Sequence, residues 1–372
     1  MEIMRKGKQT IGFKKCQKIM QENNGDLNLS NTNIIRLPRG IIVDNDLNLS
    51  NSDILKLSKK LVVGRDLNLR GSKITRLHKG IAIGRDIDLS NTVIIKLPNE
   101  FNVKGNLIMR DANITELPKN LIVEGYLDLN GATVSKLSRG LIVKKYIDLN
   151  NSTIKSLPED LIVYQGLWLN NSTITELPDS LIVNGYLDLR NTNITKLPKH
   201  LTVNGNIDLR YSKITEIPSD LKVSGDLDLR YTDISELPPN LTVGGSIKIS
   251  HTNITELPRS LKIGGNLDLQ ETRIKELPGS LKVGGNLNLQ GTEITKLPAG
   301  LTVDGTINLM YSAIKTISKN ITVKGSLRLK HTKISRLPSG LTVGGVLEVR
   351  YTRITELPDN LTVGGLCLTD TL

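Results

Sequence analysis

The chain has 372 residues, with 49 lysines and arginines against 37 aspartates and glutamates, and a formal net charge of +12. Only 3% of the residues are aromatic although 38% are hydrophobic, so the core must be aliphatic, which favours stacked repeats over an ordinary globular enzyme. The two cysteines exclude a disulfide framework or a cysteine-rich zinc site, and no apolar run is long enough to span a membrane.

Residues 1–24 differ from everything that follows. The segment is basic and has no apolar run of the kind found in a cleavable secretory signal. Residues 8–23 are predicted to form a short amphipathic helix whose Ile11, Cys16, Ile19 and Met20 cover the first repeat, because an open end would expose core and strand edges. We therefore expect an N-terminal cap at 1–24 and one repeat domain at 25–372.

From Gly25 to Gly364 the sequence repeats every 20 residues without insertion or deletion, which gives 17 coils. A typical coil is LTVNGNIDLRYSKITEIPSD, residues 201–220. Six positions are Leu, Ile, Val, Met or Phe in every coil, and in this one they are Leu201, Val203, Ile207, Leu209, Ile214 and Ile217. The repeat predicts one continuous aliphatic core.

The spacing within a coil predicts its local structure. Ile207 and Leu209 are two residues apart, which places both on one face of a strand and their neighbours on the other. A recurrent glycine, as at Gly105 and Gly225, suggests a turn with positive φ. Of the 14 prolines, 13 share one position and exclude a helix there. The prediction is a β-rich solenoid with a parallel strand face and an extended or polyproline-like outer side.

The run LDLRNTNITKLP, residues 187–198, resembles the leucine-rich repeat pattern LxLxxNxLxxLP. The 20-residue length is similar to the LPX-type repeats of bacterial effectors of the YopM and IpaH group. This resemblance implies a leucine-rich repeat solenoid that binds a protein in a host cell, after export from the bacterial cytoplasm without a cleavable signal. Effector ligases of the IpaH type carry a separate helical catalytic domain, for which this chain has no room.

The chain departs from that pattern at one position of the repeat. Thr or Ser replaces the usual Asn, as at Thr192 and Ser212, and Ala replaces it at Ala112 and Ala132. A hydroxyl group can form a shorter version of the turn-stabilising hydrogen bond, whereas Ala cannot. A two-stranded coil closer to a parallel β-helix therefore stays open as an alternative.

The few aromatic residues gather outside the core positions. Tyr126, Tyr146, Trp168 and Tyr186 fall on the strand face, and Tyr211, Tyr231, Tyr311 and Tyr351 share the position just after the strand. Tyr and Trp are favoured at binding hot spots. We predict a protein-binding surface across residues 126–231.

Charged residues form ladders in the same stretch of sequence. Asp188, Asp208 and Asp228 each precede an arginine by two residues, and these arginines are Arg190, Arg210 and Arg230. The two ladders either neutralise one another along the sheet or contribute to recognition. The predicted partner-binding residues are Tyr126, Tyr146, Trp168, Tyr186, Asp188, Arg190, Asp208, Arg210, Tyr211, Asp228, Arg230 and Tyr231.

No catalytic constellation is apparent. The four histidines are scattered and have no evident nucleophile with an orienting group. Asp226 and Asp228 have the oxygen ligands for Ca²⁺, but Arg210 and Arg230 beside them oppose a cation. We therefore expect no enzyme activity, no metal and no cofactor.

Two alternative functions remain open. Residues 1–85 hold 17 lysines and arginines against 7 aspartates and glutamates, a net charge of +10, so this end is a candidate for weak contact with nucleic acid or another anionic polymer. The aromatic and acidic strand face also fits a β-solenoid enzyme acting on polysaccharide. The exposed ends of a solenoid leave room for an oligomer.

Overall fold

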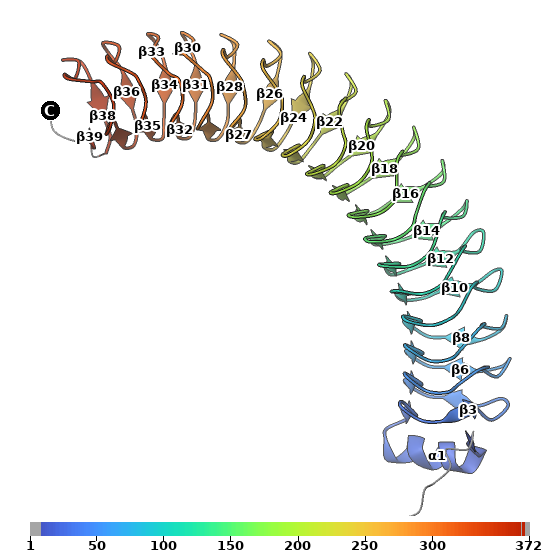
Figure 1. Ribbon diagram of the computed structural model, residues 1–372. Coiled ribbons are helices and arrows are strands. Elements are labelled where there is room, and N and C mark those ends of the chain that lie inside the picture. Colours follow the sequence, from blue (N-terminus) through green and yellow to red (C-terminus); the bar gives the residue numbers. More distant parts are fainter. Residues whose placement is uncertain (1–8, 366, 369–372) are drawn as a thin grey trace, which may run out of the picture. The chain divides into compact units, whose positions relative to one another are not determined.

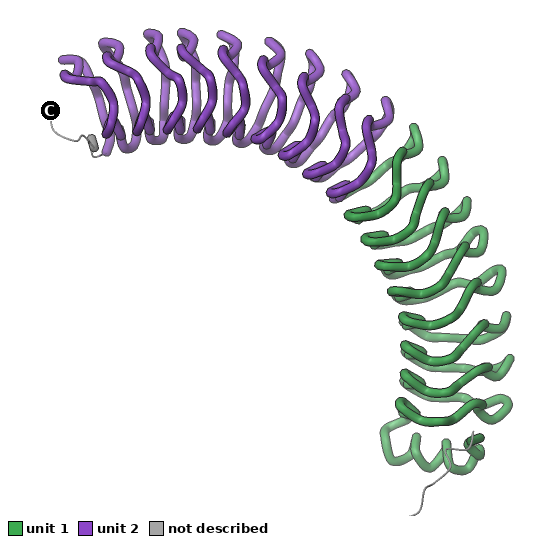
Figure 2. The backbone as a smooth tube through the Cα atoms, viewed as in Figure 1, with its two compact units in different colours: residues 1–185 green, residues 186–372 purple. Residues whose placement is uncertain are grey.

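The computed structural model describes residues 9–365 and 367–368. The chain divides into two compact units, Met1–Gly185 and Tyr186–Leu372 (Figure 2). Each unit is a stack of coils in which every coil adds one short parallel strand to a strand face and another to a second sheet (Figure 1). This confirms the predicted β-rich solenoid, a leucine-rich repeat of seventeen 20-residue coils.

The first unit begins with β1 (Gln9–Thr10), followed by helix α1 (Phe13–Glu22). Strand β1 pairs in parallel with β3 (Ile34–Arg36). Its strand face consists of β2 (Leu27–Asn28), β5 (Leu47–Asn48), β7 (Leu67–Asn68), β9 (Ile87–Asp88), β11 (Leu107–Ile108), β13 (Leu127–Asp128), β15 (Ile147–Asp148) and β17 (Gly166–Trp168). Its other strands are β4 (Ile42–Val43), β6 (Val62–Val63), β8 (Ala82–Ile83), β10 (Asn102–Val103), β12 (Ile122–Val123), β14 (Ile142–Val143), β16 (Ile162–Val163) and β18 (Ile182–Val183).

The second unit repeats this arrangement. Its strand face consists of β19 (Tyr186–Asp188), β21 (Ile207–Asp208), β23 (Leu227–Asp228), β25 (Ile247–Lys248), β27 (Leu267–Asp268), β29 (Leu287–Asn288), β32 (Ile307–Asn308), β35 (Leu327–Arg328), β37 (Leu347–Glu348) and β39 (Cys367–Leu368). Its second sheet consists of β20 (Thr202–Val203), β22 (Lys222–Val223), β24 (Thr242–Val243), β26 (Lys262–Ile263), β28 (Lys282–Val283), β31 (Thr302–Val303), β34 (Thr322–Val323), β36 (Thr342–Val343) and β38 (Thr362–Val363). On the outer side β30 (Lys296–Leu297) pairs with β33 (Thr316–Ile317).

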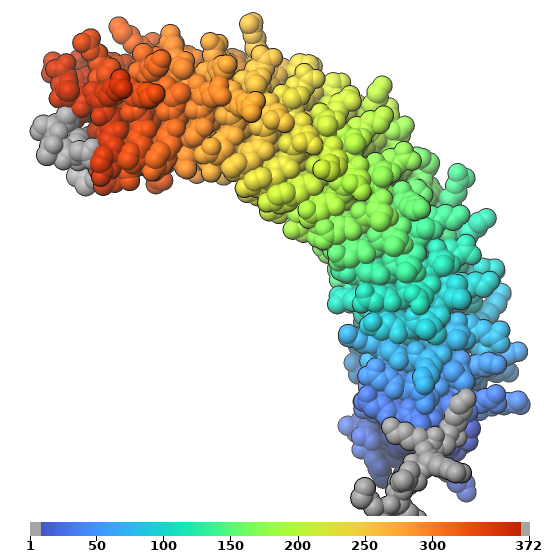
Figure 3. All heavy atoms as spheres, in the orientation of Figure 1, coloured from blue at the N-terminus to red at the C-terminus, as the bar shows by residue number. Residues whose placement is uncertain are grey.

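The register of the sheets equals the period of the sequence. Leu127 lies opposite Ile147, and Asp128 lies opposite Asp148, 20 residues further along. Equivalent residues of consecutive coils therefore stack as ladders, at the strand spacing of about 4.8 Å. In Figure 3 the colours run in bands across each unit, so each stretch of surface belongs to a few consecutive coils.

The aliphatic core lies at the predicted positions. In the typical coil Leu209 and Ile214 are fully buried, and the aromatic replacement Phe101 is only 7% exposed. Beside the core, the hydroxyl of Thr192 donates to the carbonyl oxygen of Leu189 at 2.7 Å, three residues back. Similar bonds recur at many of the Thr and Ser residues of this position, so a hydroxyl group does stabilise the turn in place of the asparagine of the repeat pattern that the sequence resembles.

The recurrent glycines correct one prediction, because they do not have positive φ. A Cβ atom on Gly105 would lie 2.6 Å from the carbonyl carbon of Arg85, and one on Gly225 would lie 2.8 Å from that of Gly205. In these coils the backbone of the preceding coil lies too close for a side chain, and this close approach favours glycine there. Other coils hold a larger residue at the same position, such as Lys145 or Gln165. Positive φ occurs instead just after the strand-face strand, for example at Asn151 (56°).

Helix α1 falls inside the segment predicted to be helical. It buries Cys16 completely, and the nearby Ile11 is 8% exposed. The helix ends where the amide of Gly25 donates to the carbonyl of Met20 at 2.8 Å, and Gly25 has a φ of 91° that favours glycine. That this segment acts as a cap stays a prediction.

The outer side of each coil is extended and closes with a turn at the proline position. The amide of Leu201 donates to the carbonyl of Pro198 at 3.4 Å, and neighbouring coils pair here through isolated parallel bridges such as Lys196 with Glu216. Across residues 9–365, α1 is the only helix. No helix in the part of the chain that the structure covers is long and apolar enough to cross a membrane.

Candidate partner-binding site

Three of the predicted aromatic residues form a cluster on the strand face of the first unit. The rings of Tyr126 and Tyr146 stack with their centroids 4.6 Å apart and their planes within 5°. The centroid of Trp168 lies 4.4 Å from that of Tyr146, with the planes tilted by 58°. Trp168 lies two residues after the tyrosine position, on the same face of the strand. In its coil the tyrosine position is occupied by Gly166, which has no side chain. All three side chains are half-buried.

Two carboxylates lie beside these rings. Asp128 is 1% exposed, and its Oδ2 accepts a hydrogen bond from Nε of Arg110 at 2.6 Å. Burial raises the pKa of Asp148, and the negative charge of Asp128 raises it further. The hydrogen bonds from Asn150 and Asn130 act in the opposite direction but do not cancel this rise. Burial is also the main reason why the pKa values of Tyr126 and Tyr146 are raised. The predicted residues did not include Arg110, Asp128 and Asp148. The sequence did contain a signal for them, because they occupy the same positions of the repeat as the predicted Arg190 and Asp188.

The second unit holds the predicted aspartate and arginine ladders, whose side chains form one continuous row of ion pairs. We call this row, Asp188, Arg190, Asp208, Arg210, Asp228 and Arg230, the zipper. Arg190 donates to both carboxylate oxygens of Asp188, from Nε at 2.9 Å and from Nη2 at 2.6 Å. Its Nε also lies 3.7 Å from Oδ2 of Asp208 in the next coil. The same pattern is repeated by Arg210 with Asp208 and Asp228, and by Arg230 with Asp228. The two ladders therefore neutralise one another, as one of the two sequence interpretations required.

The zipper determines the protonation of its members. Burial raises the pKa of Asp208, but the hydrogen bonds from the side chain and backbone of Arg210 outweigh burial and leave this pKa below its usual value. The hydroxyl of Tyr186 donates to Oδ2 of Asp208 at 3.1 Å. Burial, followed by the charges of Asp188 and Asp208, raises the pKa of Tyr186. At neutral pH these shifts keep Asp208 ionised and Tyr186 protonated.

Tyr211 and Tyr231 lie outside the strands, in the turn that follows each strand-face strand. Each has a φ of 59°, in the left-handed region that favours glycine and asparagine. Their rings stack at 4.7 Å, and His251 continues the stack at 4.6 Å. We call these three residues the Tyr211 ladder.

A second such stack occurs five coils further along, at Tyr311, His331 and Tyr351, which we call the Tyr311 ladder. The centroids are 4.8 and 4.6 Å apart and the planes lie within 16° and 3° of each other. The sequence interpretation had noted the tyrosines but treated the histidines as scattered. The signal was present, because His251 and His331 share the tyrosine position of the repeat.

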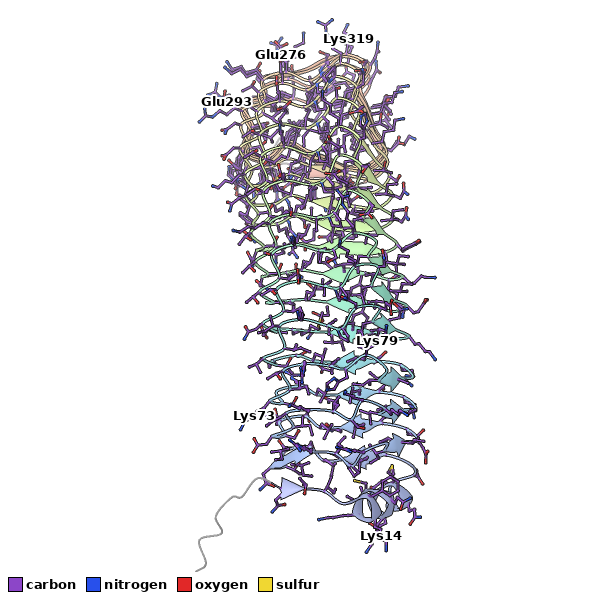
Figure 4. All side chains as sticks on the ribbon, turned by 90° about the vertical axis from the view of Figure 1, so that its right-hand side faces the viewer. Lys14, Lys73, Lys79, Glu276, Glu293 and Lys319 are labelled. Atoms are coloured by element: carbon purple, nitrogen blue, oxygen red, sulfur yellow. The ribbon has the colours of Figure 1, made fainter. Side chains whose placement is uncertain are left out.

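The basic N-terminal coils carry several exposed ion pairs. Nζ of Lys73 lies 2.6 Å from Oδ1 of Asp53, and Nζ of Lys79 lies 2.5 Å from Oε2 of Glu100. Figure 4 labels the two lysines. Burial, and then the charges of Arg76 and its basic neighbours, lowers the pKa of His78. The local potential is therefore positive in spite of the pairs. Residues 1–8 of the basic segment lie outside the described residues.

No cluster of metal ligands marks an active site in the described part of the chain. Among the residues with assigned positions, no three His, Cys, Asp or Glu side chains form a group that would hold a metal ion. A hollow of about 940 Å³ lies on the outer side of the first unit, between the turns of four coils. Basic and acidic residues alternate along it, as at Lys96, Glu116 and Lys136, so it favours neither sign of charge.

These coils define a leucine-rich repeat solenoid. No family model matches the chain, and no curated protein matches it by sequence. Among solved structures, YopM from Yersinia enterocolitica is similar, with 17% identity and a TM-score of 0.49, over 96% of this chain and 94% of that one. A leucine-rich repeat protein of Leptospira interrogans is 20% identical with a TM-score of 0.41, over 73% of this chain and 89% of that one. A chain of the Toll–Spatzle complex from Drosophila is 15% identical with a TM-score of 0.47, over 86% of this chain and 51% of that one.

Proposed function

We propose that this protein is a non-enzymatic scaffold that binds another protein through its strand face. The observation that carries the proposal is the cluster of Tyr126, Tyr146 and Trp168 on that face, in a chain of which only 3% is aromatic. Hot spots of protein interfaces are enriched in Tyr, Trp and Arg. The zipper of the second unit supplies the third of these residue types.

The zipper also favours a protein partner over a free anion. Its arginines are 30–35% exposed while the aspartates they bind are at most 9% exposed, so each guanidinium group is held with one edge accessible. Groups that are already ordered lose little side-chain entropy when a partner binds. Because their charge is already balanced, they suit a surface of mixed polarity better than a strongly anionic one.

We further propose that the protein is a bacterial effector, made in the bacterial cytoplasm and exported into a host cell. The support is the resemblance of its LPX-type repeats, such as residues 187–198, to those of effectors in the YopM and IpaH group. A fusion to a reporter that is active only in host cytosol tests this. Signal in infected cells that depends on a secretion system supports export, and its absence contradicts export while leaving protein binding untouched.

The binding proposal is tested by titration of a purified partner. Crosslinking and affinity capture from host-cell extract identify a candidate, which is then purified and titrated by calorimetry into the wild-type chain and its variants. Trp168→Ala and Tyr146→Ala should each weaken the complex by about 2 kcal/mol, and Arg210→Glu should weaken it too. Glu216→Lys on the outer side is the matched control and should have little effect. Equal effects on both sides contradict the strand-face site.

Two further outcomes select the alternative functions. Affinity that falls steeply with salt, and is greatest for DNA, RNA or anionic vesicles, selects a polyanion binder acting through residues 1–85. Glycan hydrolysis that is abolished by Asp148→Asn selects a polysaccharide enzyme, since burial has raised the pKa of Asp148 in the way a general acid requires.

A further inference from the structure

The three residues of the Tyr311 ladder adopt a backbone conformation that their side chains disfavour. Tyr311, His331 and Tyr351 have φ values of 60°, 58° and 58°. Non-glycine residues held in this region are strained, and aromatic residues more so than asparagine. The fold does not require aromatic residues there, because the same position holds Asn151 and Gly291 in other coils. The rings are exposed and do not serve the core, which points to a use outside the fold.

The stacked arrangement decides which part of each ring faces solvent. Each ring covers a face of its neighbour, with centroids 4.8 and 4.6 Å apart, so ring edges and polar atoms point outward. Tyr311 is 55% exposed and Tyr351 is 57% exposed. The edge of an aromatic ring carries the positive part of its quadrupole, and tyrosine hydroxyls donate hydrogen bonds. The ladder thus presents a weakly positive row of donors.

Cations surround this row. The ammonium nitrogen of Lys330 lies 5.5 Å from the centroid of Tyr351. Lys333 and Arg353 are exposed and lie two residues after His331 and Tyr351, in the turn that carries the rings. The nearest acid on the strand is Glu348, whose Oε1 accepts a hydrogen bond from Nη2 of Arg350 at 2.7 Å. Among the described residues, the surroundings of the Tyr311 ladder are therefore cationic.

The Tyr211 ladder has the same ring geometry without this charge. Arg210 and Arg230, which precede its tyrosines, are bound to aspartates of the zipper. The residues that follow at the flanking position are Lys213 and Asp233, which are of opposite sign. The chain thus contains one cationic and one balanced version of a single surface feature.

We propose that the Tyr311 ladder, together with Lys330, Lys333 and Arg353, binds an acidic peptide segment of a protein partner lying along the coils. Carboxylates accept hydrogen bonds from tyrosine hydroxyls and pair with Lys and Arg, which matches the charge on this surface. A single-stranded nucleic acid is disfavoured, because its bases bind to open ring faces, and both faces of His331 and the inner faces of Tyr311 and Tyr351 are covered within the stack. This surface lies in other coils than the strand-face site, so the peptide-binding proposal can be tested separately from the proposed function.

The full chain is titrated at physiological salt, which screens weak contacts of polyanions with residues 1–85, into a fluorescein-labelled peptide of alternating Glu and Asp, and anisotropy is read. The peptide is long enough to pass the three coils. The same peptide with Gln and Asn, and an oligothymidine of equal charge, serve as comparison probes. The acidic peptide should bind and the amide peptide should not. Replacing Lys330, Lys333 and Arg353 together by Gln should weaken binding by more than about tenfold.

Variants at the ring position separate the ladder from a general effect of charge. Tyr351→Asn should weaken peptide binding several-fold and still fold normally, because asparagine occupies the equivalent position at Asn151. Tyr231→Asn in the Tyr211 ladder, and Lys56, Lys59 and Lys60 changed together to Gln, should leave binding unchanged. Tighter binding of oligothymidine than of peptide, an equal loss in Tyr231→Asn, or no binding of the acidic peptide overturns the proposal.

Discussion

Two positions of the repeat constrain which residue type they hold. At one the constraint is the distance to the neighbouring coil, and at the other it is the backbone angle φ. A Cβ atom on Gly264 would lie 2.0 Å from the carbonyl oxygen of Gly244, so no other residue fits without moving a coil. Just after the strand the constraint is φ, which all residue types at that position satisfy at different cost. The first position holds larger residues such as Lys104 and Tyr164 in other coils, so glycine is needed only where the backbones approach this closely. The second position carries the exposed rings.

The glycine constraint predicts a sharp difference between two similar substitutions. Gly264→Ala should lower the free energy of unfolding by about 1–3 kcal/mol, because the backbone of the preceding coil must shift. Gly279→Ala is the control, since no atom lies within 4 Å of its Cβ position. It should be neutral or slightly stabilising. Urea unfolding of both variants measures the difference, and equal stabilities would contradict the close approach of the coils.

At the scale of the element, the 20-residue period determines most of what the structure contains. Because the period equals the strand register, the strands, the core positions and the ladders of Tyr126, Asp188 and Arg190 were all predictable. The period does not reveal distances between coils, and so the reason for the glycines was wrong. Nor does it show that the rings at one position stack face to face. The histidine in each exposed ladder was missed although its position in the repeat is that of the tyrosines.

The zipper gives a test of pH dependence with a definite sign. The pKa of Asp208 is lower in the folded than in the unfolded protein, so the unfolded state binds more protons between the two values. The stability that this carboxylate supplies is complete above its unfolded pKa of about 3.9 and is lost as pH falls through the folded value. Asp148 has a raised pKa and shifts stability in the opposite direction.

Comparison with a variant isolates Asp208 from the other carboxylates. Asp208→Asn should be clearly less stable than wild type at pH 6, and the difference should shrink as the pH is lowered below 3.9, the usual aspartate value. Urea unfolding at a series of pH values measures this. A difference that stays constant with pH would show that the charge of Asp208 does not contribute.

On the scale of the whole molecule, each unit is a linear array in which a coil contacts only its neighbours. The core is continuous along such an array, and Ile214 is fully buried within the second unit. Damage to one coil therefore removes the support of the coils on either side.

Ile214→Asp should destabilise the second unit by more than about 4 kcal/mol, because it places an unpaired charge in an aliphatic core. Hydrogen exchange should show loss of protection over many coils around residue 214. Lys213→Asp, on the exposed neighbouring position, is the control and should leave protection unchanged. Loss confined to one coil would contradict a continuous core.

The basic N-terminal coils give a prediction about the whole surface charge. Replacing Lys56, Lys59, Lys60, Arg76 and Lys79 by Gln should leave affinity for a protein partner unchanged and remove weak binding to DNA or anionic vesicles at low salt. The slope of polyanion affinity against salt should flatten in the same variant. Binding that survives physiological salt, or that prefers one nucleotide sequence, would shift the function toward nucleic-acid recognition.

The constant register has a consequence for how the chain folds during synthesis. The amide of Leu227 bonds to the carbonyl of Ser246, and that of Gly244 to Val223, so the pairing partners are always about one coil apart. The entropy of closing each loop therefore does not grow as the chain lengthens. A ribosome adding about 5–20 residues per second completes a coil in a few seconds, far longer than hairpin-scale pairing requires. We expect each coil to dock on the one before it as it emerges, so that an interrupted nascent chain is a shorter folded array with an open strand edge.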